Sequence, residues 1–196
     1  MVDSLSQIEN RGSIAFISPN PGDGTTTAAI ATAYSMGENL SEKVLLVDLN
    51  ARHPSLHTIF DLPLSPGIGD ILADSSISNE DIIHKKEENL SVITVGGEHI
   101  FFQKELILNK FQVLLNDLKE GFDYVLFDIC PIGQLPLVNN LISLFDGVIL
   151  IIACENTTWE AAQHFKGRLE SAGANLLGAI LNKRRYYIPK WLYGSL

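Results

Sequence analysis

Residues 18–27, Ser-Pro-Asn-Pro-Gly-Asp-Gly-Thr-Thr-Thr, decide how the rest of this chain is interpreted. The stretch follows an apolar run, Ser13–Ser18, and overlaps the start of a segment with helical spacing of apolar residues, Thr26–Leu40. Glycines allow a loop to turn consecutive backbone N–H groups inward, and the N-terminus of the next helix adds partial positive charge. A glycine-rich loop between a strand and a helix is the context of a phosphate-binding loop. On this segment alone, a Gly/Pro turn that only joins strand to helix stays an alternative.

The loop departs from the standard phosphate-binding pattern, Gly-x-x-x-x-Gly-Lys-Ser/Thr, at two positions. Pro19 occupies the place of the first glycine, and Thr25 occupies the place of the lysine. A lysine there places a compact positive charge on the phosphates, which a threonine hydroxyl cannot replace. Losing one such preorganised group typically lowers a rate by about 10²–10³. We therefore predict a loop that holds phosphate but transfers it poorly. Its predicted cofactor-binding residues are Gly22, Asp23, Gly24, Thr25, Thr26 and Thr27.

Short apolar runs alternate with helical patterns along the chain. The runs are continuous in Val, Ile and Leu, which is typical of strands covered on both faces. They predict strands at Ser13–Ser18, Lys43–Asp48, Leu90–Val95, Tyr124–Asp128, Gly147–Ala153 and Leu176–Asn182. Apolar residues at helical spacing predict helices at Thr26–Leu40, Leu108–Leu118 and Ala162–Ala172. The predicted fold class is α/β, a doubly wound and mostly parallel sheet with helices on both faces.

A chain of 196 residues suits one well-filled core. We predict one domain over residues 1–185 and a short basic and aromatic tail at 186–196. Within the domain, Pro, Gly, Ser and Asp residues punctuate Asp61–Glu88, which predicts loops and short helices. Cations and aromatics near the C-terminus suit a membrane surface, a docking contact with a membrane protein, or packing on the domain itself, and these alternatives stay open.

Composition and charge limit the classes of partner. The formal net charge of −9 disfavours nucleic acid, because binding its phosphates requires clustered Lys and Arg. The longest apolar run falls short of the roughly 20 residues that span a bilayer, and the first residues lack the apolar core of a signal peptide. We expect a cytoplasmic protein, with association at the inner membrane only through a partner. Cys130 and Cys154 lie in or just after predicted buried strands, so we expect reduced, structural thiols.

Two predicted strands end in carboxylates at the edge where open α/β sheets bind ligands. Asp48 ends one strand and Asp128 ends another. We predict both as catalytic residues. Together with the Thr26 hydroxyl they are also the predicted Mg²⁺ ligands, because carboxylates and a loop hydroxyl commonly hold Mg²⁺ beside nucleotide phosphates. A lone strand-terminal aspartate is more often a cap or turn residue. Here these two strand ends and the glycine-rich loop after Ser13–Ser18 make three strand ends directed at one place, which favours a shared pocket.

With these motifs in place, the sequence resembles the bacterial tyrosine kinases of capsular and exopolysaccharide synthesis, which are related to the MinD and ParA deviant-Walker ATPases. The family loop, Pro-Gly-acidic-Gly-Lys-Ser/Thr-Thr, is matched at Pro21–Thr27 except for Thr25. The family's second motif, Asp-x-Asp-x-Arg-x-Pro, is matched at Asp48–Pro54 except for Asn50. Phe127-Asp128 resembles the third motif. The closing strand resembles the one whose asparagine, here Asn182, reads the adenine ring.

The resemblance implies a P-loop NTPase-like fold, ATP or ADP with Mg²⁺ as ligands, and a membrane-embedded polysaccharide co-polymerase or export protein as partner. The departures at Thr25 and Asn50 imply weak or no phosphoryl transfer. We therefore predict a degenerate relative, a pseudokinase that supports or regulates exopolysaccharide or capsule synthesis and export. A homo-oligomer stays open, since residues 1–12 lack the Glu-x-x-Arg-x-x-Arg pattern that joins family subunits into a ring.

Two alternatives to this interpretation stay open. The first is an active MinD- or ParA-like ATPase switch for positioning or membrane cycling. It requires a lysine that reaches the phosphates from elsewhere, because Asn20 occupies the position of that group's signature lysine. The second is a scaffold that binds no nucleotide and keeps only a vestigial pocket.

Overall fold

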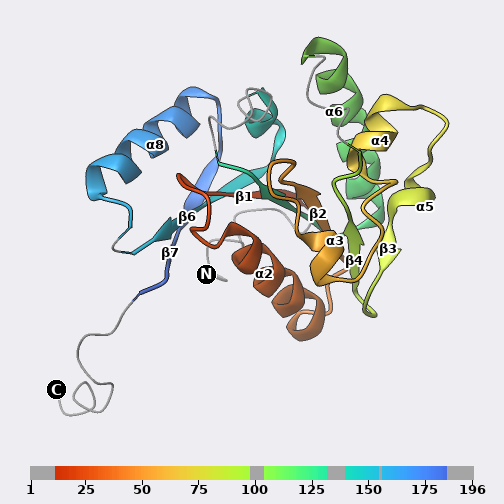
Figure 1. The fold of residues 1–196 in the computed structure, drawn as a ribbon, viewed down its shortest axis with the longest axis horizontal. Helices are drawn as coiled ribbons and strands as arrows, with labels where there is room; N and C mark the ends of the chain where they lie inside the picture. Colours follow the sequence, from red (N-terminus) through yellow and green to blue (C-terminus); the bar gives the residue numbers. More distant parts are fainter. Residues whose placement is uncertain (1–11, 98–103, 132–139, 155, 185–196) are drawn as a thin grey trace.

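A seven-stranded sheet forms the centre of the molecule (Figure 1). The computed structural model describes residues 12–97, 104–131, 140–154 and 156–184. The strand order is β3-β4-β2-β5-β1-β6-β7, and neighbouring strands are parallel except for β3 with β4. The strands are β1 (Gly12–Ile17), β2 (Val44–Leu49), β3 (His84–Lys85), β4 (Leu90–Ile93), β5 (Tyr124–Ile129), β6 (Gly147–Ala153) and β7 (Leu176–Asn182).

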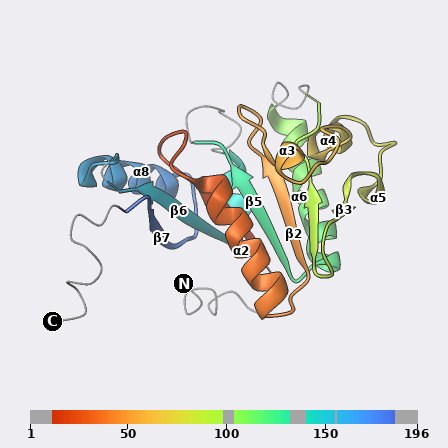
Figure 2. The same cartoon turned by 60° about the horizontal axis from the view of Figure 1, so that its bottom comes forward.

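Helices cover both faces of this sheet (Figure 2). On one face lie α2 (Thr25–Asn39) and the short α3 (Leu56–Ile59), whose buried residues join one apolar cluster. The other face carries α4 (Ile68–Ala73), α5 (Asn79–Ile82), α6 (Lys104–Gly121) and α8 (Trp159–Ser171). A short 3-10 turn, η2 (Ile142–Leu144), precedes β6. The predicted fold class, a mostly parallel sheet with helices on both faces, is confirmed.

Strand β1 shows why the apolar runs are continuous. All of its residues are buried. Ile14 and Phe16 belong to the cluster under α2, whereas Ala15 and Ile17 belong to the cluster on the opposite face. Because successive side chains of a strand point to opposite faces, a strand covered on both sides must be apolar at every position.

The predicted elements agree with the structure to within a few residues, with two differences. Leu108–Leu118 is the middle of the longer helix α6. The segment predicted as loops and short helices contains α4 and α5 but also the edge strand β3, in which His84 pairs antiparallel with Val92. A two-residue strand in a polar segment is too short to show a period-two pattern, so this strand could not be predicted from the sequence.

The structure tests the prediction for the two cysteines but not the prediction for the C-terminal tail. Cys130 and Cys154 are both free, and burial raises the pKa of the Cys130 thiol to about 12, which keeps it protonated. The tail predicted at 186–196 lies outside the described residues, so the domain boundary stays a prediction. Across the described ranges, no helix combines the length and the apolar character needed to cross a membrane.

The strand order brings the three predicted strand ends together. β1 lies between β5 and β6, and β2 lies on the other side of β5. Phe16 of β1 is in register with Asp128 of β5, and Asp128 is in register with Asp48 of β2. Since these strands are parallel, the loop that follows β1 and both carboxylates lie at the same edge of the sheet.

Candidate functional site

The loop between β1 and α2 is shaped by two glycines and braced by a buried carboxylate. Gly22 and Gly24 have φ angles of +80° and +100°, a region that residues with a Cβ rarely adopt. Asp23 is fully buried, and its carboxylate accepts hydrogen bonds from the Asn20 N–H at 3.1 Å and the Asn156 side-chain amide at 3.4 Å. The Asp23 side chain is therefore occupied within the protein, and only the Asp23 backbone can contact a phosphate.

Thr25 points into the domain. Its side chain is buried, and its hydroxyl donates to the Ser18 hydroxyl at 2.9 Å. Ser18 in turn donates to the Asn20 carbonyl at 2.9 Å. The position where a phosphate loop carries its lysine is thus closed by an internal hydrogen-bond chain that ties the two ends of the loop together. Thr27, by contrast, is exposed at the start of α2.

Thr26 and Asp128 form the direct contact between loop and sheet. The Thr26 hydroxyl donates to Asp128 Oδ2 at 2.6 Å. Asp128 is fully buried, and its other oxygen, Oδ1, has no hydrogen-bond partner. Burial raises the pKa of Asp128 to about 7, with the nearby Asp48 carboxylate adding to the rise and the Thr26 hydrogen bond opposing it. A buried, half-satisfied carboxyl is costly and is typical of a binding or catalytic site.

Asp48 holds the loop that follows β2. Its Oδ1 accepts the Asn50 N–H at 2.9 Å, and its Oδ2 accepts the Ser55 and Leu56 N–H groups at 3.1 Å each. Burial raises the pKa of Asp48 against the opposing effect of these three donors. Asn50, at the second motif position, uses its side-chain oxygen to accept the His53 N–H at 3.2 Å. Both side chains thus have local structural partners.

The predicted Mg²⁺ ligands fit that ion. Thr26 and Asp128 are in contact, and Asp48 is the in-register neighbour of Asp128 across β2 and β5. The unpartnered Asp128 Oδ1 supplies a free acceptor at this point. Mg²⁺ commonly takes one or two protein oxygen ligands and keeps the rest of its shell for water and phosphate, so Asp128 and the Thr26 hydroxyl are the groups best placed to hold it. A bound Mg²⁺ would neutralise charge on a nucleotide's phosphates.

The end of β7 closes the outer side of the loop, a contact that the sequence did not predict. The Asn182 side-chain amide donates to the Asp23 carbonyl at 2.9 Å. A Cβ added to Gly24 would come within 2.0 Å of that amide, so only glycine allows this approach. The ammonium of the next residue, Lys183, donates to the Gly22 carbonyl. Asn182, predicted to read adenine, thus lies beside the loop.

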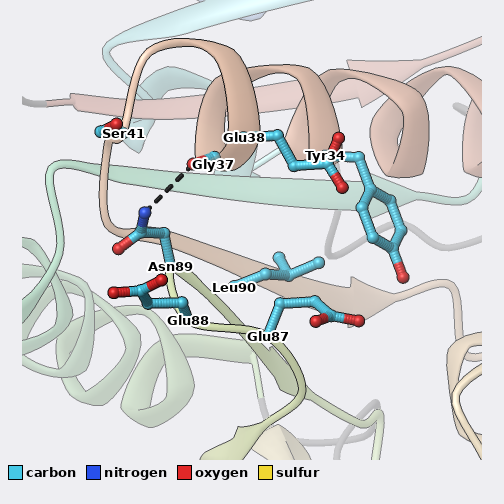
Figure 3. Close-up of a pocket in the computed structure, with 8 residues that line it drawn as sticks. All are labelled: Tyr34, Gly37, Glu38, Ser41, Glu87, Glu88, Asn89 and Leu90. Atoms are coloured by element: carbon cyan, nitrogen blue, oxygen red, sulfur yellow. Dashed lines mark hydrogen bonds between the residues drawn. The ribbon is translucent and has the colours of Figure 1, made fainter.

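A separate hollow lies at the other end of the strands (Figure 3). It has a volume of about 310 Å³ and lies between the C-terminal half of α2 and the residues that lead into β4. Asn89 spans it by donating to the Gly37 carbonyl at 3.1 Å. Glu38, Glu87 and Glu88 line it, and this acidic lining disfavours an anionic ligand. The phosphate site is therefore expected at the loop and not in this hollow.

The loop, the two carboxylates and the strand order also relate this chain to known proteins. A family described as an AAA domain matches residues 12–176. The tyrosine-protein kinase YwqD of Bacillus subtilis (strain 168) is 30% identical over 174 residues, which cover 88% of this chain and 73% of YwqD. This chain belongs to the bacterial tyrosine-kinase family. The resemblance inferred from the sequence motifs is confirmed.

Solved structures support the same assignment for this tyrosine-kinase family member. The kinase domain of VpsO superposes with a TM-score of 0.81 at 27% identity, covering 94% of this chain and 92% of that domain. Cobyrinic acid a,c-diamide synthase from Mycobacterium smegmatis, solved with a bound ATP analogue and magnesium, superposes with a TM-score of 0.71 at 19% identity over 87% of this chain and 74% of the synthase. The second likeness shows the shared fold alone, and that P-loop NTPase-like fold is the one predicted.

Replacing Asp128 with asparagine tests its buried carboxyl in metal-free buffer. The pKa of Asp128 is about 7 in the folded chain and 3.8 when unperturbed, so the folded state binds the proton more tightly. Its contribution to stability is full below the lower value and is lost as the pH rises through the higher one. Asparagine does not titrate. Between pH 3.8 and about 7, the free energy of unfolding of the native chain should therefore fall relative to that of Asp128→Asn, by up to about 1.4 kcal/mol per pH unit.

Urea denaturation in steps from about pH 4 to about pH 8 measures this difference in the free energy of unfolding. Asp117→Asn, which removes an exposed carboxylate on α6, is the surface control. A pH-independent difference between Asp128→Asn and the native chain would contradict the raised pKa.

Proposed function

We propose that this chain is a degenerate member of its kinase family, which binds a magnesium adenine nucleotide weakly at residues 21–27 and transfers phosphoryl groups poorly or not at all. The observation that carries this proposal is the orientation of Thr25. At the position of the family lysine, a buried hydroxyl is bonded to Ser18 inside the protein. The contact between Thr26 and Asp128 is kept beside it.

Binding is supported by the charges that remain. Relative to the family pattern, Thr25 removes one cation and Asn50 removes one anion, so the net charge of the pocket barely changes. The loop keeps its glycines at positive φ, which lets backbone N–H groups turn toward an anion, and α2 begins directly after Gly24. These groups give the loop a capacity for phosphate even though Thr25 supplies no cation.

Transfer is disfavoured by Asp48 and Asn50, which stand at the two acidic positions of the second motif. Asp48 spends both oxygens on backbone N–H groups of its own loop. Asn50 cannot take a proton. The pocket therefore lacks both the lysine that stabilises charge as the phosphoryl group moves and a second anionic acceptor.

Calorimetry with ATP and ADP in the presence of Mg²⁺ tests nucleotide binding. We expect weak but measurable binding, and we expect Thr26→Val to weaken the Mg²⁺-dependent part because it removes the hydroxyl beside Asp128. Thr58→Val is the matched control, since Thr58 is an exposed threonine on α3, outside the loop. If the native chain gives no heat of binding up to millimolar nucleotide, the proposal is wrong. The alternative of a scaffold that binds no nucleotide would then remain.

Autophosphorylation and steady-state ATP hydrolysis test the degenerate character. The purified chain is expected to form no phosphotyrosine with ATP and Mg²⁺. Restoring the family residues with Thr25→Lys and Asn50→Asp together is expected to raise the hydrolysis rate by about 10²–10³, the usual value of such a preorganised charge. Asn50→Asp alone is the control for the anion. Robust autophosphorylation by the native chain would refute this part.

The ATPase switch is the second candidate, and one observation favours it. Lys183 brings an ammonium to the loop from a distant part of the chain, which is the kind of lysine this candidate requires. Steady-state ATP hydrolysis by the native chain, without phosphotyrosine, would select the switch over the degenerate kinase.

We further propose that the chain works beside a membrane-embedded polysaccharide co-polymerase or export protein. Family membership supports this, together with the acidic net charge of −9, which gives little attraction to anionic lipid by itself. The chain is expected to float with liposomes only when they carry the partner's cytosolic segment. Flotation with bare anionic liposomes would argue for direct anchoring instead.

A further inference from the structure

We propose that Lys183 supplies the phosphate-binding cation that the loop lacks at Thr25, delivered from the end of β7 instead of from within the loop. This inference rests on the proposed nucleotide site at residues 21–27. It adds a specific residue to that site, one that lies 161 positions away in sequence from the loop carbonyl it contacts.

The end of β7 is fastened to the loop at two consecutive positions. β7 pairs in parallel with β6 as far as Asn182, which is in register with Ala153. The Asn182 amide donates to the Asp23 carbonyl at 2.9 Å, and the Lys183 ammonium donates to the Gly22 carbonyl. Asn182 and Lys183, which are consecutive in the chain, thus bind the consecutive loop carbonyls of Asp23 and Gly22.

The backbone at Lys183 directs this contact. Its φ angle is +56°, in the left-handed region that residues with a Cβ seldom adopt. Its N–H donates to the Asn182 side-chain oxygen at 2.9 Å. The Asn182 side chain therefore bonds the loop with its nitrogen and Lys183 with its oxygen. This turn at the end of β7 brings the lysine side chain back over the loop.

The ammonium has the capacity to bind phosphate where it lies. Lysine carries three donors, and within the described part of the chain one of them is placed on the Gly22 carbonyl. The side chain is exposed, so the ammonium can exchange that neutral carbonyl for a phosphate oxygen without first crossing the protein. A phosphate oxygen adds the attraction between opposite charges, which the neutral carbonyl does not supply, so the ammonium favours the phosphate.

The negative charge around the loop favours a nearby cation. Asp23, Asp48 and Asp128 are all buried at or beside the loop. A nucleotide's phosphates add further negative charge, and Thr25 offers a hydroxyl that is already bonded to Ser18. A lysine at the rim restores a positive charge for ground-state binding. Because it approaches from the outer side of the loop, it compensates affinity without replacing the lysine that the family places in the loop itself.

The competing role for Lys183 is a mechanical clip that only holds the loop in shape. The two roles differ in what they do to ligands with and without phosphate. A clip affects every ligand of the pocket alike, whereas a phosphate cation affects ADP and leaves adenosine unchanged.

The test measures the affinities of Mg²⁺-ADP and of adenosine for the full chain and for Lys183→Met. We expect the variant to bind Mg²⁺-ADP at least about tenfold more weakly, the value of one charge-assisted hydrogen bond, and to bind adenosine as the native chain does. Lys183→Arg should recover part of the loss. Lys166→Met is the matched control, because Lys166 is an exposed lysine on α8 that pairs with Glu170 at 3.3 Å.

A second comparison places Lys183→Met in a Thr25→Lys background. If both lysines serve the same phosphates, the loss of ADP affinity caused by Lys183→Met should shrink there. Unchanged ADP affinity in Lys183→Met, while the native chain binds ADP, would overturn the role of Lys183 and leave the nucleotide site standing. An equal loss for ADP and adenosine would assign the clip role and overturn this proposal. No binding by the native chain would overturn both.

Discussion

The hydrogen bond from Thr26 to Asp128 joins the first turn of α2 to the end of β5, and the geometry of the pocket depends on it. It fixes the loop over the centre of the sheet, where β1, β5 and β2 lie side by side. It also leaves one oxygen of a fully buried carboxyl without a partner. A protein that needed only a strand-to-helix turn would gain stability from an apolar residue there, so the retained carboxyl indicates a site built to meet a ligand.

The two departures from the family pattern have the same structural character. Thr25 and Asn50 both turn their polar atoms to local backbone or side-chain partners, Ser18 in one case and His53 in the other. In both cases the side chain that stands at the motif position stabilises its own loop. Asp48 likewise stabilises its own loop, because its two oxygens accept hydrogen bonds from three backbone N–H groups. The motif survives in this member of the kinase family, but several of its side chains serve the fold.

The contacts of β7 show how a pocket can be completed from outside its own motif. Asn182 and Lys183 reach the carbonyls of Asp23 and Gly22 because β7 pairs beside β6, which pairs beside β1. Gly24 makes the approach possible by presenting no Cβ to the Asn182 amide. Sheet order, and not sequence distance, therefore decides which residues surround the phosphate loop.

The α/β class could be predicted from the amino-acid sequence alone, and so could the loop at residues 18–27 and the strand-end carboxylates Asp48 and Asp128, because burial on two faces and turn chemistry leave local patterns. The sequence also identified the missing lysine. It could not determine the inward turn of Thr25, the use of both Asp48 oxygens, or the place of Lys183 on the loop. The place of Lys183 depends on which strands become neighbours, and such a long-range contact leaves no periodic signal in the chain. The contacts of Thr25 and Asp48 join residues two to eight positions apart, and they depend on the folded conformation of their loops, which has no repeating pattern in the sequence.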